Sequence, residues 1–241
     1  MVWTTLARHI LRRPAVPGQA DPATVAAMAA RLAAAGERKL GQGTDHLLFV
    51  EHPHVVTIGR NGLESNVLAS PELLREKNVE LYESNRGGDV TYHGPGQIVA
   101  YPVMDLREWK RDVGAFVRAI EQTLIDTLGE FGVEAFRVPG LTGVWTGAGD
   151  HKAKIAAIGV HLSRWVSTHG WALNVTTDLR YFDYIVPCGL RKSVTSMERR
   201  GVAADPEDVK LALARHFGRL FDFEMLTERR AEMPELTGAM K

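Results

Sequence analysis

The sequence of 241 residues has one cysteine, and its charges cancel, with 29 Lys and Arg against 29 Asp and Glu. One cysteine cannot form a disulfide within the chain, which indicates a reducing compartment or a fold that does not use oxidation. A dedicated nucleic-acid binder is usually basic, so zero net charge argues against that class. No stretch reaches the ~18 consecutive apolar residues of a transmembrane helix. The most apolar segment, Thr24–Gly36, is too short and carries Arg31.

Targeting signals are weak. The first twenty residues contain three arginines and no acid, which faintly resembles a transit peptide. We expect an opening strand over Val2–Leu11 instead, in a cytoplasmic protein that uses no membrane. Hydrophobic residues make up 45% of the chain and charged residues 24%, which is ordinary globular usage. The length fits one large domain, and we expect it over residues 1–225, followed by a polar tail over 226–241.

Three predicted helices start with an acceptor side chain followed by proline: Asp21-Pro22, Ser70-Pro71 and Asp205-Pro206. The helices are expected over 22–39, 71–77 and 206–221, and a fourth, with one apolar stripe, over 111–131. Short β-type runs lie between them, at 47–51, 55–59, 79–83, 89–92, 98–102, 134–138, 155–162 and 169–175. Because strands and helices do not alternate strictly, we predict an α+β fold with a mixed, largely antiparallel sheet, flanking helices and a smaller second sheet.

The most unusual segment runs from Arg86 to Gln97 and contains four glycines and a proline. Glycine lets a backbone approach a ligand closely, and Arg86, Tyr92, His93 and Gln97 would add polar contacts. Two hairpin turns joined by a short strand would explain the same composition. The segment lacks the Lys-Ser or Lys-Thr pair of a phosphate loop and the spacing of a dinucleotide loop.

Cys188, the only cysteine, stands between Pro187 and Gly189. A lone cysteine is usually a small buried hydrophobe, but a loop presents a side chain for reaction. A thiol with a pKa near ~8.5 needs a neighbouring cation or base to become a nucleophile. The candidate partners are Lys154, His93, His151, His161 and His169.

Lys154 begins an apolar, strand-like run. Such a lysine is commonly a surface residue whose stem covers apolar neighbours. Beside a pocket, however, desolvation would lower its pKa and let it act as a base. The run from Thr168 to Val175 could pair with this strand and form one wall of a site. His52 and His54 have no third ligand at a recognisable spacing, so no metal is expected, and no GxSxG elbow indicates a serine nucleophile.

Several of these runs resemble the octanoyltransferases of lipoate biosynthesis (lipoyl(octanoyl) transferases). The resemblance rests on RGGDVTYHGPGQ from Arg86, GVW from Gly143, KIAAIGV from Lys154, HGWALNV from His169 and Pro187-Cys188-Gly189. These blocks occur in the family's order, and together with Glu51-His52-Pro53 and Thr57-Ile58-Gly59-Arg60 they span about residues 45–190. Trp171 replaces a smaller aromatic residue, and the segment from Phe136 to Lys152 is longer than in the family pattern.

The resemblance implies the fold of the biotin and lipoate protein ligases, in a single catalytic domain. It implies an acyltransferase that moves an octanoyl group from octanoyl-acyl carrier protein to a lysine of a lipoyl domain. The acceptors would belong to 2-oxoacid dehydrogenases or be the glycine cleavage H protein. It assigns catalysis to Cys188 and Lys154. Substrate binding would fall to Arg86, Gly87, Gly88, Asp89, Val90, Thr91, Tyr92, His93, Ala157, Ile158, Gly159, Gly170, Trp171 and Ala172.

The chemistry of these residues agrees with that reaction. A thiolate at Cys188 can hold the acyl chain as a thioester, and Lys154 can stabilise the thiolate and then act as a base. Converting a thioester to an amide runs downhill, so we expect no ATP, no cofactor and no metal. We also expect a monomer.

Two alternatives remain open from the sequence. An ATP-dependent lipoate–protein ligase has the same fold but needs no cysteine. A non-enzymatic protein that binds an acyl carrier would use the basic stretch Arg180–Arg200 to receive an acidic partner.

Overall fold

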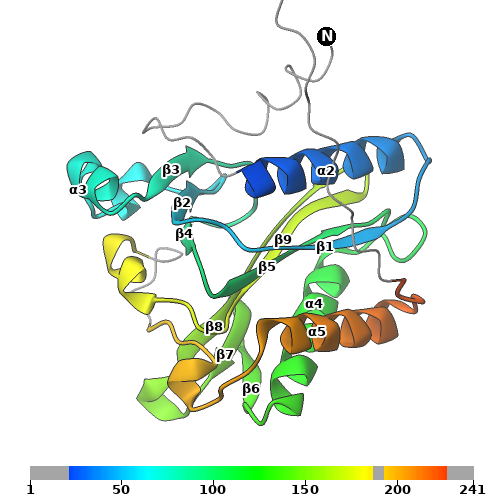
Figure 1. Cartoon of the computed structure of the whole chain (residues 1–241). Helices are drawn as coiled ribbons and strands as arrows, with labels where there is room; N and C mark the ends of the chain where they lie inside the picture. The colour runs from blue at the N-terminus through cyan, green and yellow to red at the C-terminus, as the bar shows by residue number, and fades with distance from the viewer. Residues whose placement is uncertain (1–21, 187–192, 227–241) are drawn as a thin grey trace, which may run out of the picture.

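The computed structural model describes residues 22–186 and 193–226 (Figure 1). The strand expected over Val2–Leu11 lies outside the described residues, as do Cys188 and all but the first residue of the expected tail. In the described part, no helix has both the length and the apolar character needed to cross a membrane.

The described α-helices are α2 (Pro22–Lys39), α3 (Pro71–Glu76), α4 (Val113–Glu130) and α5 (Pro206–Phe221). Single turns of 3-10 helix occur at η1 (Glu64–Asn66), η2 (Gly149–His151) and η5 (Glu198–Arg200), and a longer one at η3 (Leu179–Tyr184). The strands are β1 (His46–Val50), β2 (Val55–Ile58), β3 (Glu80–Glu83), β4 (Val90–His93), β5 (Gln97–Val103), β6 (Ala135–Val138), β7 (Leu141–Thr146), β8 (Ala153–Ser163) and β9 (Val166–Asn174).

The strands form two sheets. The large sheet has the order β1-β5-β9-β8-β7-β6, and all its neighbouring strands are antiparallel. The small sheet has the order β3-β2-β4, with β2 parallel to β3 and antiparallel to β4. The predicted α+β class, with a largely antiparallel sheet and a smaller second one, is confirmed.

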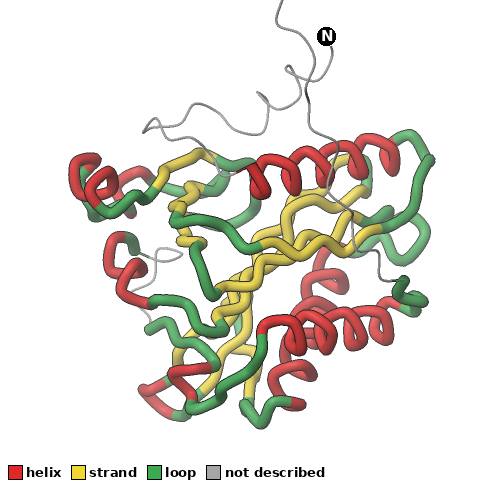
Figure 2. Tube along the Cα trace, in the orientation of Figure 1, coloured by secondary structure: helices red, strands yellow, loops and turns green. Residues whose placement is uncertain are grey.

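Helices cover the large sheet on both faces (Figures 1 and 2). One face packs on α4 and α5, where Phe116, Ile120, Leu124 and Phe217 are buried in one apolar cluster with β5, β8 and β9. Burying each such side chain contributes roughly 1.5–3 kcal/mol relative to exposing it. Helix α2 packs on the other face, against β1, β5 and β9.

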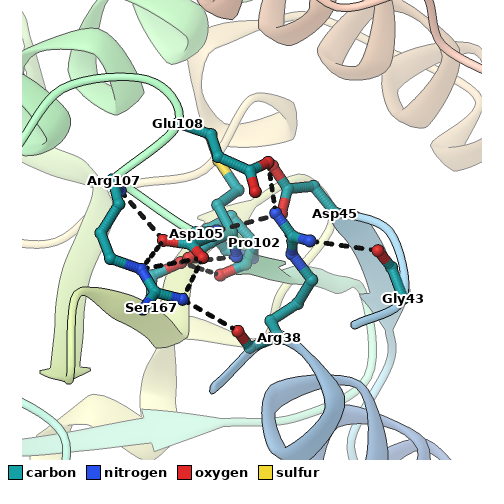
Figure 3. Close-up of polar contacts among 9 residues, drawn as sticks. Arg38, Gly43, Asp45, Pro102, Asp105, Arg107, Glu108 and Ser167 are labelled. Atoms are coloured by element: carbon teal, nitrogen blue, oxygen red, sulfur yellow. Dashed lines mark hydrogen bonds and ion pairs between the residues drawn. The ribbon is translucent and has the colours of Figure 1, made fainter. Parts of the chain in front are cut away.

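A polar cluster fixes the C-terminal end of α2 to the sheet (Figure 3). The Arg38 guanidinium donates to Asp45 at 2.8 Å and to Glu108 at 2.6 Å. Asp45 also accepts the backbone N–H of Asp105, and the Arg107 guanidinium donates both to Asp105 and to the carbonyl of Arg38. Because Arg38 is nearly inaccessible to solvent, these bonds set the position of α2 over β5 and β9.

Local sequence signals placed most of these elements. Ser70, Asp112 and Asp205 each accept a backbone N–H at the start of α3, α4 and α5, as N-caps do. Strand β7 was missed, because Gly140, Gly143 and Gly147 divide its region into short pieces without the alternation of a strand. This strand lies within the segment that is longer than in the family pattern.

We predict that Asp112→Ala destabilises the protein by ~1 kcal/mol, because it leaves the N–H of Ala115 without its acceptor at the start of α4. For a chain of this size, that loss corresponds to a decrease of ~2–4 °C in melting temperature. Calorimetry on wild type, Asp112→Ala and Asp112→Asn measures it. Asparagine also caps helices, so Asp112→Asn should melt close to wild type, and equal losses in both variants would contradict a capping role.

Candidate active site

The alternation of β8 and β9 separates two sets of residues. Ala156, Ile158 and Val160 face the cluster around α4 and α5, and so does Trp171, whose ring centroid lies 5.9 Å from that of Phe217. The intervening residues face the opposite side of the sheet, which we call the site face. It carries Ala157, Gly159, Gly170 and Ala172, and also Lys154, which pairs with Trp145 beyond a bulge in β8.

The glycine-rich loop before β4 lies directly on the site face. The N–H of Gly87 donates to the carbonyl of Val160 at 3.0 Å. A Cβ on Gly159 would lie 2.8 Å from the Gly87 carbonyl oxygen, a separation that real Cβ atoms do not show. Gly88 has a φ of +85°, which side chains other than glycine rarely adopt. Glycine at these positions is what allows the loop to contact the sheet through its backbone.

Arg86 and Asp89 hold this loop in place. The buried Arg86 guanidinium donates to the carbonyl and hydroxyl of Thr57 at 2.6 and 2.9 Å, and to the carbonyl of Gly87 at 3.0 Å. Asp89 accepts from the side chain of Asn66 at 2.6 Å and from the N–H of Leu63. Both therefore order the glycine-rich loop, and a contact of either one with substrate stays a prediction.

Strand β4 also alternates between two environments. Val90 and Tyr92 are fully buried in the core of the small sheet, and the Tyr92 ring stacks on Tyr181 at 5.1 Å. Thr91 and His93 point the other way. The side chains of Val90, Tyr92, Ile158 and Trp171 therefore belong to apolar cores, and the binding of substrate by these residues stays a prediction.

A hydrogen-bond chain fixes the tautomer of His93. The Gln97 amide donates to the Asn174 side-chain oxygen at 2.8 Å, so its own oxygen is the acceptor for His93 Nδ1 at 2.7 Å. Burial, with the charge of His52, lowers the pKa of His93 to about 3. His93 is therefore neutral, with a proton on Nδ1 and a lone pair on Nε2. Nε2 can accept a hydrogen bond, but it is a poor base.

The same chain leads to Lys154. The Asn174 side chain donates to the carbonyl of Thr195, whose N–H donates to the carbonyl of Lys154 at 2.9 Å. The Lys154 ammonium donates to the carbonyl of Thr142 at 3.1 Å and lies 5.0 Å from the centroid of the Trp145 ring. Lys154 thus projects from the site face and contacts the ring of Trp145.

Cys188 lies outside the described residues, but both of its flanking segments are placed. Val186 donates its N–H to the carbonyl of Asn66 at 2.7 Å. On the other side, Ser193 accepts the N–H of Lys154 at 2.9 Å, and Val194 forms a parallel bridge with Lys154. The described residues that precede Cys188 therefore lie beside Asn66, and those that follow it lie beside Lys154.

A buried arginine, Arg31 of α2, faces the other end of the site face. Its guanidinium donates to His169 Nδ1 at 2.9 Å and lies 4.9 Å from the centroid of the Tyr101 ring. Among the described residues no carboxylate pairs with it, and its Nε has no hydrogen-bond partner. Burial lowers the pKa of Arg31, and burial with the charge of Arg31 lowers the pKa of His169 well below its usual value.

The arginine also sets the tautomer of His169. A guanidinium only donates, so Nδ1 holds the lone pair and Nε2 carries the proton. Nε2 then donates to the Asn85 side-chain oxygen at 2.5 Å. His169 accepts a φ of +61° in this position, which is unfavourable for a residue with a Cβ. The resulting relay, Arg31–His169–Asn85, connects α2 to the residue before Arg86.

Sequence reasoning missed three members of this environment: Arg31, Asn85 and Tyr101. Arg31 stands in an Ala-rich helix and Tyr101 in an apolar strand, so neither has a local signal. His52 and His54, considered as a metal pair, bind different partners, Tyr101 at 2.6 Å and Tyr92 at 2.7 Å. Within residues 22–186 and 193–226, no three His, Cys, Asp or Glu side chains gather as metal ligands do.

Comparison with known proteins identifies related sequences. Residues 21–218 match the family model described as the lipoyl protein ligase A/B catalytic domain. The chain is 59% identical over 209 residues to an octanoyltransferase of Solibacter usitatus, covering 87% of this chain and 92% of the relative. It is 51% identical over 193 residues to an octanoyltransferase of Koribacter versatilis, covering 78% and 76%.

Solved structures with the same fold are lipoate–protein ligases. A bipartite lipoate protein ligase from Thermoplasma acidophilum superposes with a TM-score of 0.65 at 18% identity, covering 83% of this chain and 82% of that one. A lipoate-protein ligase A bound with ATP gives a TM-score of 0.66 at 19% identity, covering 83% of each chain. The fold predicted from the resemblance is confirmed.

The buried histidines predict acid sensitivity. Burial, with the charge of Arg31, lowers the pKa of His52 from 6.5 to about 4. Because the unfolded chain then binds more protons than the folded one between about pH 6.5 and pH 4, stability falls as the pH decreases through this window, by up to ~1.4 kcal/mol per pH unit per histidine. Urea unfolding of wild type and His52→Gln/His93→Gln at pH 7, 6 and 5 measures the slope.

The double variant should show a shallower pH dependence than wild type. His151→Gln, which replaces an exposed imidazole, controls for the substitution itself. Parallel curves for wild type and the double variant would show that these two histidines do not contribute.

The relay predicts that Asn85 orders the glycine-rich loop. Asn85→Ala should leave His169 Nε2–H without its acceptor and raise the hydrogen-exchange rate of the amides of residues 86–89 roughly fivefold, the equivalent of ~1 kcal/mol. Asn85→Asp retains an acceptor oxygen and should restore slow exchange. The exchange is measured by mass spectrometry on the peptide that contains the loop. An unchanged exchange rate in Asn85→Ala would contradict the prediction that the relay orders the loop.

Proposed function

The chain belongs to the lipoyl protein ligase A/B catalytic-domain family, and we propose that it transfers an octanoyl group from octanoyl-acyl carrier protein to a lysine of a lipoyl domain through a thioester on Cys188. Its relatives are octanoyltransferases, so the chain is an acyltransferase of protein lipoylation. The donor, the intermediate and the acceptor lysine belong to the proposal, as do a single catalytic domain over residues 1–225 and a monomeric state.

The observation that carries the proposal is the pairing of Lys154 with residues 193–195. It brings the residues that follow Pro187-Cys188-Gly189 in the sequence to the strand that carries Lys154 on the site face. An ammonium near a thiol favours the thiolate and lowers its pKa. The donation of the Lys154 ammonium to Thr142 and its contact with the Trp145 ring, which both suit a cation, support this role.

The first step exchanges one thioester for another. The Cys188 thiol gives its proton to Lys154, and the thiolate attacks the carbonyl carbon of the donor thioester. The bond between that carbon and the donor sulfur breaks, and the leaving thiolate takes the proton back from the Lys154 ammonium. The octanoyl chain is then on Cys188, the carrier is released as a thiol, and Lys154 is a neutral amine.

The second step forms the amide. The amine of the acceptor lysine attacks the acyl-Cys188 carbonyl, and neutral Lys154 takes the proton that the attacking nitrogen loses. The bond from carbon to the Cys188 sulfur breaks, and the Cys188 thiolate is restored beside the Lys154 ammonium. Since an amide is more stable than a thioester, the sequence needs no nucleotide.

The small residues of the site face suit the binding of the acyl chain. Ala157, Gly159, Gly170 and Ala172 present little or no side chain toward the loop that carries Gly87, so an alkyl chain there would meet apolar backbone and methyl groups. Each buried methylene contributes ~0.8 kcal/mol, so the depth available would set the preferred chain length.

Intact-protein mass spectrometry tests the intermediate. After mixing with octanoyl-acyl carrier protein, wild type should gain one octanoyl group that hydroxylamine removes, and Cys188→Ala should gain none. Lys154→Met should acylate and transfer slower by several orders of magnitude, because it keeps the bulk of the side chain but loses the charge and the base. Calorimetry on each variant confirms that it folds.

Lys154→Arg separates the two roles of the lysine. Arginine restores the positive charge but does not deprotonate in proteins, so partial self-acylation should return without transfer to a lipoyl domain. An adduct on Cys188→Ala would place the chemistry elsewhere. Transfer that requires ATP would instead favour a lipoate–protein ligase.

A further inference from the structure

The hairpin that connects β8 and β9 has an unfavourable turn. Its two central residues, Arg164 and Trp165, have φ values of +53° and +65°, and Ser163 pairs with Val166 directly across the turn. Two-residue turns with both φ positive normally carry Asn, Asp or Gly. Arg164 is exposed and Trp165 is 37% exposed, so the turn presents a cation and an indole to solvent at a cost in backbone energy.

Further cations surround this turn from other elements. Arg60, which follows β2, lies with its guanidinium 3.4 Å from His161 Nδ1 of β8, and Lys39 ends α2. Burial and the charge of Arg164 lower the pKa of Lys39, and burial with the charges of Arg60 and Lys39 lowers the pKa of His161. Ala35 of α2, one turn before Lys39, packs in one cluster with Val166, which follows Trp165. The five residues Lys39, Arg60, His161, Arg164 and Trp165 therefore lie around the end of the β8–β9 hairpin, and we call them the turn patch.

No described acid forms an ion pair with a cation of the turn patch. Asp105, which bridges to Val166 beside the turn, is paired with Arg107, and Glu108 is paired with Arg38. None of Lys39, Arg60 or Arg164 forms an ion pair with a described Asp or Glu. The basic stretch Arg180–Arg200, which the sequence suggested as a surface for an acidic partner, differs from the turn patch because two of its arginines have partners within the protein. Its Arg180 is paired with Asp178 at 2.6 Å, and its Arg200 donates to the carbonyl of Thr146.

The turn patch adjoins the glycine-rich loop. The N–H of Arg60 donates to the carbonyl of Arg86 at 3.0 Å, and His161 follows Val160, which accepts from Gly87. Along β8, His161 is seven residues from Lys154, which is ~23 Å at the rise of a strand. A partner docked on the patch could reach Lys154 only with a long arm.

We propose that the turn patch docks the acyl donor, an acidic carrier that presents its thioester on a long flexible arm. Arginine and tryptophan beside each other are the residues that most often dominate protein interfaces, and the unpaired cations supply complementarity to an acidic surface. The acceptor suits the patch less well, because its own lysine side chain is too short to cross the distance to Lys154. This inference rests on the proposed function.

Charge reversal tests it. Arg60→Glu/Arg164→Glu should raise KM for octanoyl-acyl carrier protein ~10-fold or more and flatten the dependence of kcat/KM on salt. Transfer from the octanoyl thioester of N-acetylcysteamine, which has no acidic surface, should stay within about twofold of wild type, and so should KM for the lipoyl domain. Lys110→Glu/Arg111→Glu, which reverses two exposed cations before α4, is the matched control and should behave as wild type.

Arg164→Asn separates docking from folding. Asparagine tolerates a positive φ, so this variant should melt at or above the wild-type temperature while its KM for the carrier-borne donor rises. An unchanged KM for the carrier-borne donor in the double variant would overturn the proposal. So would a rise confined to the lipoyl domain, or an equal rise in the control. A wild type that transfers nothing from octanoyl-acyl carrier protein would instead refute the proposed function, and with it this donor.

Discussion

The contact between the glycine-rich loop and β8 joins the two sheets of this protein, and the site depends on it. Gly87 reaches Val160 through its backbone because Gly159 presents no Cβ, and Arg86 ties the same loop to Thr57 of the small sheet. A side chain at Gly159 would separate the surfaces. The site face, the loop and the segment that starts at Ser193 therefore hold their relative positions through close backbone packing.

Around this contact the protein keeps its buried polar groups neutral or hydrogen-bonded. His93 is bound through Gln97 and Asn174, and His169 through Arg31 and Asn85, so each imidazole has one defined tautomer. The positive charge of Arg31 is offset by a nitrogen lone pair and the face of Tyr101, with no carboxylate among the described residues. Such an arrangement orients the loop and leaves Lys154 as the candidate proton carrier.

Much of the fold could be predicted from the sequence, because its signals are local. A capping side chain before a proline and an apolar stripe indicates a helix start, and Ser70 and Asp205 act in the structure as their positions predicted. Strand β7 was missed because Gly143 interrupts it and Gly140 and Gly147 flank it. It is held by pairing with β6 and β8, which are partners that a local pattern does not reveal. The substrate-binding residues were predicted as continuous runs, and in the structure pleating turns the side chains of Ile158 and Trp171 toward the opposite face, so their role in substrate binding stays a prediction.

By itself, the sequence determined the residue types on which the proposed chemistry depends: one thiol in the run Pro187-Cys188-Gly189, a lysine at the head of a strand, and glycines where a backbone must come close. Tertiary structure alone decided which polar residues gather around the lysine and the glycines. Arg31 and His169 are 138 residues apart, and Arg60 and His161 are 101 apart, yet both pairs are in contact. No periodicity records such pairs, because a contact across sheets and helices depends on the path of the whole chain.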